Sequence, residues 1–149
     1  IIKKSSWHRE ETVDRQTMLK AGRRIGGTHF IVVDADEAIT HNFANENTGS
    51  WALRRWVLML EPSQSLYMFW IYLWKSVKYF RTDLLLNEGG VFQHHINCVF
   101  RDDGEATYEG EFIHTSRVPY NLVNGYQVVM DQNVGLLHFQ FINWQDVML

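Results

Sequence analysis

The sequence lacks several features that would place it in a familiar class of protein. It has one cysteine, Cys98, which excludes an internal disulfide framework and leads us to expect a reducing, cytoplasmic compartment. The formal net charge is −3, so no basic surplus indicates binding to nucleic acid. No apolar run approaches the roughly 18 residues of a membrane-spanning helix. No apolar segment of the kind found in signal peptides follows the first four residues.

The composition is that of a folded domain. The chain has 149 residues, of which 46% are hydrophobic, 21% charged and 14% aromatic, and this balance excludes intrinsic disorder. It opens without a methionine, in a loop-like segment before a helix, and it stops at "NWQDVML", where a helical pattern begins. We therefore expect residues 1–149 to be a single partial domain cut from a larger protein.

Periodicity predicts a mixed order of helices and strands. A helix is expected over 9–24, ended by the glycine pair at 26–27, and a fully apolar strand follows over 28–33. We expect a polar loop over 41–50, a helix over 51–60 and one or two strands over 66–80. Further strands are expected over 91–100, 106–115, 126–130 and 135–141. The prediction is an α/β domain with a mixed, mostly parallel sheet and flanking helices.

Three carboxylates follow the apolar strand in "FIVVDADEAI" (30–39). The carboxyl ends of buried strands are where open α/β sheets bind ligands, and Asp34 and Asp36 share a face if the chain stays extended. Two oxygen ligands on one face suit Mg²⁺ or Mn²⁺, which often also hold substrate phosphates. The alternative is a solvated turn or a helix N-terminus capped by Asp36 and Glu37.

This segment resembles a known family. "GGTHFIVVDADEAIT" is similar to the strand and Asp-x-Asp segment of inverting glycosyltransferases of the family 2 type, which have the GT-A fold. The preceding "DRQTMLKAGRRI" resembles the helix that carries Arg-Asn in those enzymes, although Gln16 follows Arg15 here. His138 in "LLHFQF" resembles their downstream metal-binding histidine. The first β-α-β units of that family, which hold the nucleotide base, have no counterpart in this sequence, so the domain looks truncated.

The resemblance implies a metal-dependent transfer of sugar from a nucleotide-sugar donor to a saccharide or other hydroxyl acceptor. Asp34, Asp36 and His138 would hold Mn²⁺ or Mg²⁺, and Arg15 would contact the donor together with the two aspartates. The cation would neutralise the diphosphate that leaves.

An inverting transfer also needs a group that takes the proton of the acceptor hydroxyl. The candidates are Asp102, Asp103, Glu111 and His114, and of these Asp103 and Glu111 are the predicted catalytic residues. The alternative is structural: "RDDG" has the composition of a surface turn, and Glu111 has that of a solvent-facing strand residue.

Two further features have two interpretations each. Trp70, Tyr72 and Trp74 fall on one face of a predicted strand, where they would stack on a sugar ring or pack in the core. Arg117 would bind phosphate through its two-pronged guanidinium or lie on the surface.

Two other functions compete with the transferase. A haloacid-dehalogenase-like phosphatase also has a strand ending in Asp-x-Asp, but that family has Thr or Val where this chain has Ala38. A non-catalytic carbohydrate-binding or assembly module would account for the aromatic content. Dependence on a metal separates the transferase from such a module.

Overall fold

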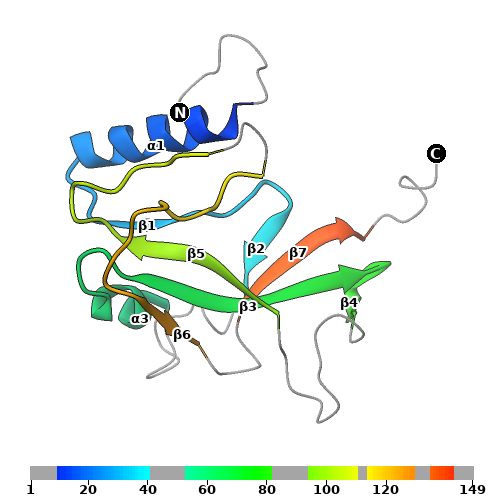
Figure 1. Ribbon diagram of the computed structural model, residues 1–149. Helices are drawn as coiled ribbons and strands as arrows, with labels where there is room; N and C mark the ends of the chain where they lie inside the picture. Colours follow the sequence, from blue (N-terminus) through cyan, green and yellow to red (C-terminus); the bar gives the residue numbers. More distant parts are fainter. Residues whose placement is uncertain (1–9, 41–52, 82–93, 111–113, 130–134, 143–149) are drawn as a thin grey trace.

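The computed structural model describes residues 10–40, 53–81, 94–110, 114–129 and 135–142 (Figure 1). The described helices and strands are, in chain order, α1 (Glu11–Arg24), β1 (His29–Ile31), β2 (Glu37–Ile39), α3 (Leu53–Met59), β3 (Ser65–Trp74), β4 (Ser76–Phe80), β5 (His95–Arg101), β6 (Tyr126–Val128) and β7 (Gly135–Phe141). The predicted loop over 41–50 and the predicted catalytic residue Glu111 lie outside the described residues.

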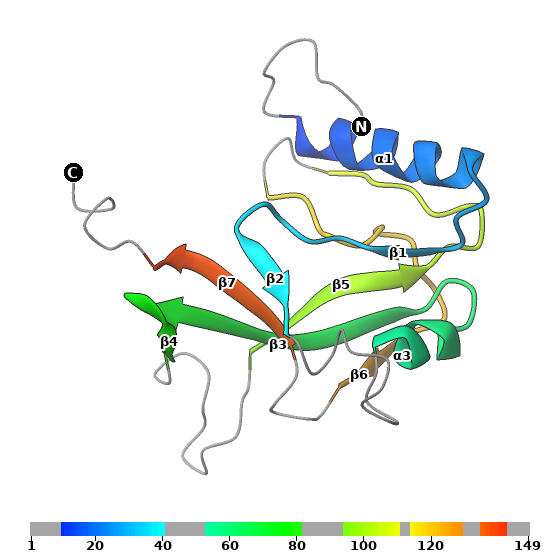
Figure 2. The same cartoon turned by 180° about the vertical axis from the view of Figure 1, so that it is seen from behind.

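The fold is α/β, with a mixed and curled sheet that contains more of the described residues than the two helices do. The strand order is β1-β5-β3-β7-β2, and β4 and β6 also pair with β3. Only β6 and β7 run parallel to β3, and the other four pairings are antiparallel. The prediction of a mostly parallel sheet is therefore wrong. Figure 2 shows the curl, with β2 and β7 rising from the middle of the sheet.

The reason for that error lies in the apolar run at 30–33. Only His29–Ile31 forms a strand, and it pairs antiparallel with β5. Phe30 and Val32 pack inward, whereas Ile31 is 41% exposed and Val33 is also exposed. Four consecutive apolar residues predict a strand buried on both faces, but only one face is covered in the described structure.

The helix α1 covers that inner face of β1 and β5 (Figure 1). Leu19 is its buried residue and packs with Phe100, Tyr108 and Val118. A side chain at Gly22 would collide with the ring of Phe30, so glycine allows helix and strand to approach closely. The helix ends before the glycine pair, as predicted.

The predicted strand over 106–115 is another correction, because its described residues form no strand. Its backbone donors are used by side chains instead: Thr107 N donates to Asn121 Oδ1 and Tyr108 N donates to Gln16 Oε1, both at 2.8 Å. A segment whose amides are taken by side chains cannot also form a strand ladder.

The central strand β3 behaves as its sequence predicts. Phe69, Ile71 and Leu73 are buried, and the alternating aromatic residues are half-buried. The helix α3 packs Val57 against the other end of the strand, in a cluster that includes Leu66 and Met68. No helix in the described ranges is long and apolar enough to cross a membrane.

The strand β7 joins the two ends of the described chain in one sheet. A Cβ atom at Gly135 would collide with the backbone of Phe69, so glycine permits the close parallel pairing with β3. The register places His138 opposite Glu37 on β2 and opposite Tyr72 on β3. These three side chains consequently lie on one face of the sheet.

Candidate functional site

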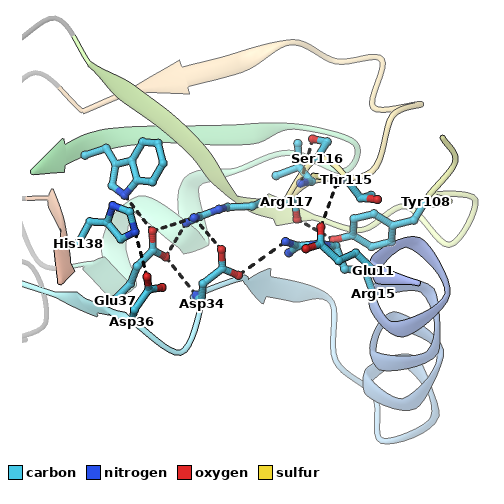
Figure 3. Close-up of polar contacts among 12 residues, drawn as sticks. Glu11, Arg15, Asp34, Asp36, Glu37, Tyr108, Thr115, Ser116, Arg117 and His138 are labelled. Atoms are coloured by element: carbon cyan, nitrogen blue, oxygen red, sulfur yellow. Dashed lines mark hydrogen bonds and ion pairs between the residues drawn. The ribbon is translucent and has the colours of Figure 1, made fainter. Parts of the chain in front are cut away.

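The segment after β1 is a turn rather than an extended chain. The amide of Glu37 donates to the carbonyl of Asp34 at 3.1 Å, which closes a four-residue turn over 34–37. The two aspartates therefore do not share a face, and their carboxylates point to different partners (Figure 3). The turn alternative describes the backbone correctly, and no helix follows, because the chain continues into β2.

Glu37 is the anchor of this turn, whereas its sequence position suggested only a cap for a helix. Its side chain is 0% exposed, and its two carboxylate oxygens accept four hydrogen bonds from the described residues. Arg117 donates from both terminal nitrogens, at 2.5 and 2.7 Å, the indole of Trp70 donates at 2.8 Å, and the amide of Asp34 donates at 3.0 Å. A buried carboxylate satisfied in this way fixes the turn against β3.

Asp34 turns toward two arginines. Arg117 Nη2 donates to its Oδ2 at 2.8 Å, and Arg15 Nη2 lies 3.6 Å from Oδ1. Burial works against the charge of Arg117, but the hydrogen bonds to Glu37 and the attraction of both carboxylates outweigh it, so the pKa of Arg117 is raised above its usual value. Arg117 is therefore a buried cation that organises the turn, and the interpretation as an ordinary surface arginine is wrong.

Asp36 points the other way, toward β7. Its Oδ2 lies 3.1 Å from Nε2 of His138, although the two residues are 102 positions apart in the sequence. The carboxylate is 51% exposed, whereas the imidazole is buried. An octahedral ion with ligand bonds of about 2.2 Å would hold neighbouring ligand atoms about 3.1 Å apart, so this pair has the spacing of two adjacent metal ligands.

The third predicted ligand, Asp34, is oriented differently. It is engaged by Arg117 and Arg15, on the side of the turn away from His138 (Figure 3). Among the described residues, no group of three His, Cys, Asp or Glu side chains is arranged to hold a metal ion. Asp36 and His138 therefore contact each other as a pair, and a metal site formed with Asp34 stays a prediction.

Aromatic rings surround the histidine. Trp70 stacks on His138 with ring centroids 4.9 Å apart, and Tyr72 meets the same imidazole edge to face at 5.1 Å. The guanidinium of Arg117 lies 5.2 Å from the centroid of Trp70. The half-buried aromatic face of β3 thus holds the imidazole and the guanidinium in place.

A cleft opens beside the turn, with a volume of about 390 Å³. Its walls come from the start of α1, from β3 and β5, and from residues 114–117. Its lining includes Glu11, Arg15, Asp34, Tyr67, Asn97, His114, Ser116 and Arg117. A second cavity of about 330 Å³ lies between α1 and β1, and its lining is mainly apolar.

The predicted catalytic residue Asp103 lies elsewhere. It follows β5 and is next to Asp102, whose amide bonds to the carbonyl of Thr28, just before β1 begins. The 34–37 turn lies beyond the other end of β1, on the order of 20 Å along the chain direction. Asp103 caps two backbone amides with Oδ1, and these bonds lower its pKa. The structure does not bring it to the site.

The sequence signals for the residues that do meet were uneven. The sequence predicted four of them, Arg15, Asp34, Asp36 and His138. The structure brings them together at the 34–37 turn. Glu37 and Trp70 gave no signal of their pairing, because the hydrogen bond spans 33 positions.

Comparison with protein families found no family model that matches the chain, and comparison with curated proteins found no match either. The site is therefore interpreted from its own geometry.

Proposed function

We propose that this protein is part of a metal-dependent glycosyltransferase, which moves a sugar from a nucleotide-sugar donor to an acceptor hydroxyl. The observation that carries the proposal is the contact between Asp36 and His138, at 3.1 Å. It supports a cation site next to a cleft, assembled from the two segments whose sequences resemble the metal-binding parts of GT-A enzymes.

The charges of the turn support a requirement for metal. Among the described residues, Arg15 and Arg117 pair with Asp34 and Glu37, and Asp36 contacts the imidazole of His138, so the turn has one negative charge that no arginine balances. A diphosphate leaving group would be repelled by that excess. A divalent cation on Asp36 and His138 would make the net charge of the turn positive. It would also stabilise the negative charge that develops on the leaving phosphate.

The chain's own residues would position the reactants. Glu37 and Arg117 hold the turn rigid. Asp36 is therefore already in position, and the turn does not need to reorganise during the reaction. Of the base candidates in the described ranges, only His114 lines the cleft. Its backbone has a φ of 63°, a conformation that histidine adopts uncommonly. We propose that its imidazole accepts the proton of the acceptor hydroxyl as the oxygen attacks the donor sugar.

The test is a comparison of Asp36→Asn with the unaltered protein. The substitution keeps the shape of the side chain and removes a charged ligand, so transfer from uridine or guanosine diphosphate sugars should fall at least about 100-fold. Excess EDTA should have the same effect. Mn²⁺ should broaden the NMR signals of the His138 ring in the unaltered protein but not in Asp36→Asn.

The matched control is Asp103→Asn, at the far end of β1. It removes a carboxylate of the same type from the turn after β5 and should leave transfer within about twofold. Normal transfer by Asp36→Asn, or full activity in excess EDTA, would contradict the proposal. Saccharide binding that ignores EDTA, with no transfer under any condition, would favour a carbohydrate-binding module instead.

A further inference from the structure

The hairpin of β3 and β4 lies at one end of the sheet. β5 pairs with β3 only as far as Phe69. β4 then pairs with Leu73 and Trp74, and the register shifts between these two residues, so that 77–79 have no partner on β3. Figure 1 shows β4 at the end of β3 opposite to the end beside α3. Residues 74–81, which we call the hairpin end, therefore lie at the margin of the sheet.

The hairpin end exposes apolar side chains. Val77 is 67% exposed and Tyr79 is 66% exposed, and Phe80 beside them is also exposed. A single exposed apolar side chain is common on protein surfaces, but three within four positions form a patch. Such a patch on a folded domain indicates a surface that contacts a partner.

The same segment is positively charged. It contains Lys75, Lys78 and Arg81 and no acidic residue, whereas the whole chain has a net charge of −3. Lys75 and Lys78 are exposed, and neither forms an ion pair with a carboxylate of the described residues. The guanidinium of Arg81 lies 5.0 Å from the centroid of the Trp74 ring, and the ammonium of Lys75 lies 6.0 Å from it. The hairpin end is therefore a basic region on an acidic protein.

Apolar and basic side chains in one short segment fit the surface of an anionic lipid bilayer. Aromatic and aliphatic side chains enter the boundary between headgroups and hydrocarbon, while lysines are attracted to the lipid phosphates. A single-stranded nucleic acid would need open aromatic faces for its bases, but two cations already contact the Trp74 ring, and Val77 has no ring. A second copy of this chain would bring the same positive charge against the first.

We propose that the hairpin end docks this protein on the surface of an anionic membrane. Val77 and Tyr79 enter the headgroup boundary, and Lys75 and Lys78 contact the lipid phosphates. The remainder of the chain carries the negative charge and is repelled by the same surface, so the hairpin end sets the orientation of the bound protein. This assignment does not depend on the proposed transferase.

The first experiment measures co-sedimentation of the protein with vesicles of phosphatidylcholine that contain about 30% phosphatidylserine, at low salt and with EDTA present. Binding should be saturable, should be at least about tenfold weaker with phosphatidylcholine alone, and should weaken steeply in about 0.5 M salt, which screens the charges. The double variant Lys75→Gln with Lys78→Gln should bind about 25-fold more weakly, because each lysine near an anionic surface contributes about fivefold.

The apolar contribution has a matched control in the same chain. Tyr120 and Val123 are the same residue types at 82% and 78% exposure, and 118–126 contains no basic residue. Val77→Ser with Tyr79→Ser should weaken vesicle binding at least about tenfold, whereas Tyr120→Ser with Val123→Ser should leave it within about twofold. All four positions are exposed, so both double variants should keep the parent's free energy of unfolding in urea.

A fluorescent label tests which part of the protein touches the membrane. Cys98 is buried, and burial raises its pKa to about 12, so it does not compete for a thiol reagent. The emission of an environment-sensitive dye attached to Val77→Cys should shift to the blue when the anionic vesicles are added. The same dye attached to Val123→Cys should show no shift.

Three results would overturn the assignment. One is the absence of saturable binding to the anionic vesicles at low salt. Another is vesicle binding that Val77→Ser with Tyr79→Ser leaves unchanged, or an equal blue shift from the dye at position 123. The third is a complex with a single-stranded oligonucleotide, or a dimer in solution, that the same double variant disrupts while the vesicles are not bound. The hairpin end would then belong to a nucleic-acid site or to an interface between copies.

Discussion

Two acidic segments lie at opposite ends of β1, and they use their carboxylates differently. At 102–103, Asp102 receives two hydrogen bonds from Arg23, at 2.6 and 2.7 Å, and its side chain is only 5% exposed. Asp103 caps its own turn. At 34–37, one carboxylate, that of Glu37, is buried and fully bonded, while Asp34 and Asp36 remain partly open to solvent beside a cleft.

The two segments differ in which carboxylates stay accessible to solvent. In both segments a carboxylate accepts hydrogen bonds from two nitrogens of an arginine elsewhere in the chain, so the ion pair alone does not distinguish them. What distinguishes the 34–37 turn is that its buried pair supports a second, exposed carboxylate that faces an imidazole. A rigid support beneath an accessible group is the arrangement that a binding site requires.

The largest expected effect comes from removing the positive charge of Arg117 beneath the turn. Arg117→Met leaves the buried carboxylate of Glu37 without its main partner, and the free energy of unfolding should fall by about 3–5 kcal/mol. Urea denaturation measures the loss. The double variant Arg117→Met with Glu37→Gln should regain part of it, because the unpaired charge is gone. A single variant as stable as the parent would show that the pair does not anchor the turn.

The corresponding substitution at the 102–103 segment should lower the free energy of unfolding by less. Arg23→Met removes the bidentate bond to Asp102, but the arginine side chain is partly exposed, so water can reach the carboxylate once the arginine is gone. We expect a loss of about 1–3 kcal/mol, and a spectroscopic melt of both variants measures the difference. A larger loss for Arg23→Met than for Arg117→Met would reverse the comparison between the two ends.

A smaller effect is expected at the two exposed aspartates. Asp103→Ala frees two backbone amides and should cost about 1 kcal/mol, whereas Asp36→Ala removes a half-exposed group and should change stability by less than about 0.5 kcal/mol. Chemical denaturation of both variants gives the ranking. An Asp36 variant that lost more stability than the Asp103 variant would assign Asp36 a structural role.

The smallest expected effect is a change in the pH dependence of the free energy of unfolding. Hydrogen bonds from the backbone, that of Glu105 first, lower the pKa of Asp103 in the folded protein. Its ionised form therefore contributes stability above the unfolded pKa of about 3.9, and this contribution disappears as pH falls through the folded value. The stability difference between Asp103→Asn and the parent should shrink between pH 5 and pH 3, as measured by urea denaturation, in the range of about a few tenths of a kcal/mol. A difference that grew on acidification would contradict this sign.

Local pattern was enough to predict many elements. The helix α1, the strands β3 and β7, and the alternation of buried and half-buried residues along β3 follow from periodicity and from the glycines at 26–27. These features depend on neighbours within a few positions, which is the range that a sequence pattern samples. The carboxylates after β1 were also recognisable, because buried strands seldom end in three acidic residues.

Strand direction and pairing could not be predicted in the same way. The apolar run at 30–33 is equally compatible with a strand buried on two faces or on one, and only the packing of α1 against Phe30 decided between them. The turn at 34–37 likewise depended on Arg117, 80 positions beyond Glu37, which holds that carboxylate in place.

The amino-acid sequence specifies which residue types lie near this turn in the chain or in its strands: acidic groups after a strand, a late histidine, and aromatic residues on alternate positions of one strand. Which of these residues meet depends on the fold. Because β7 pairs with both β2 and β3, His138 faces Asp36 and stacks on Trp70, while Asp34 is turned to the arginines. These contacts join positions between 68 and 102 residues apart, and the register of the strands that creates them is fixed by packing across the whole sheet.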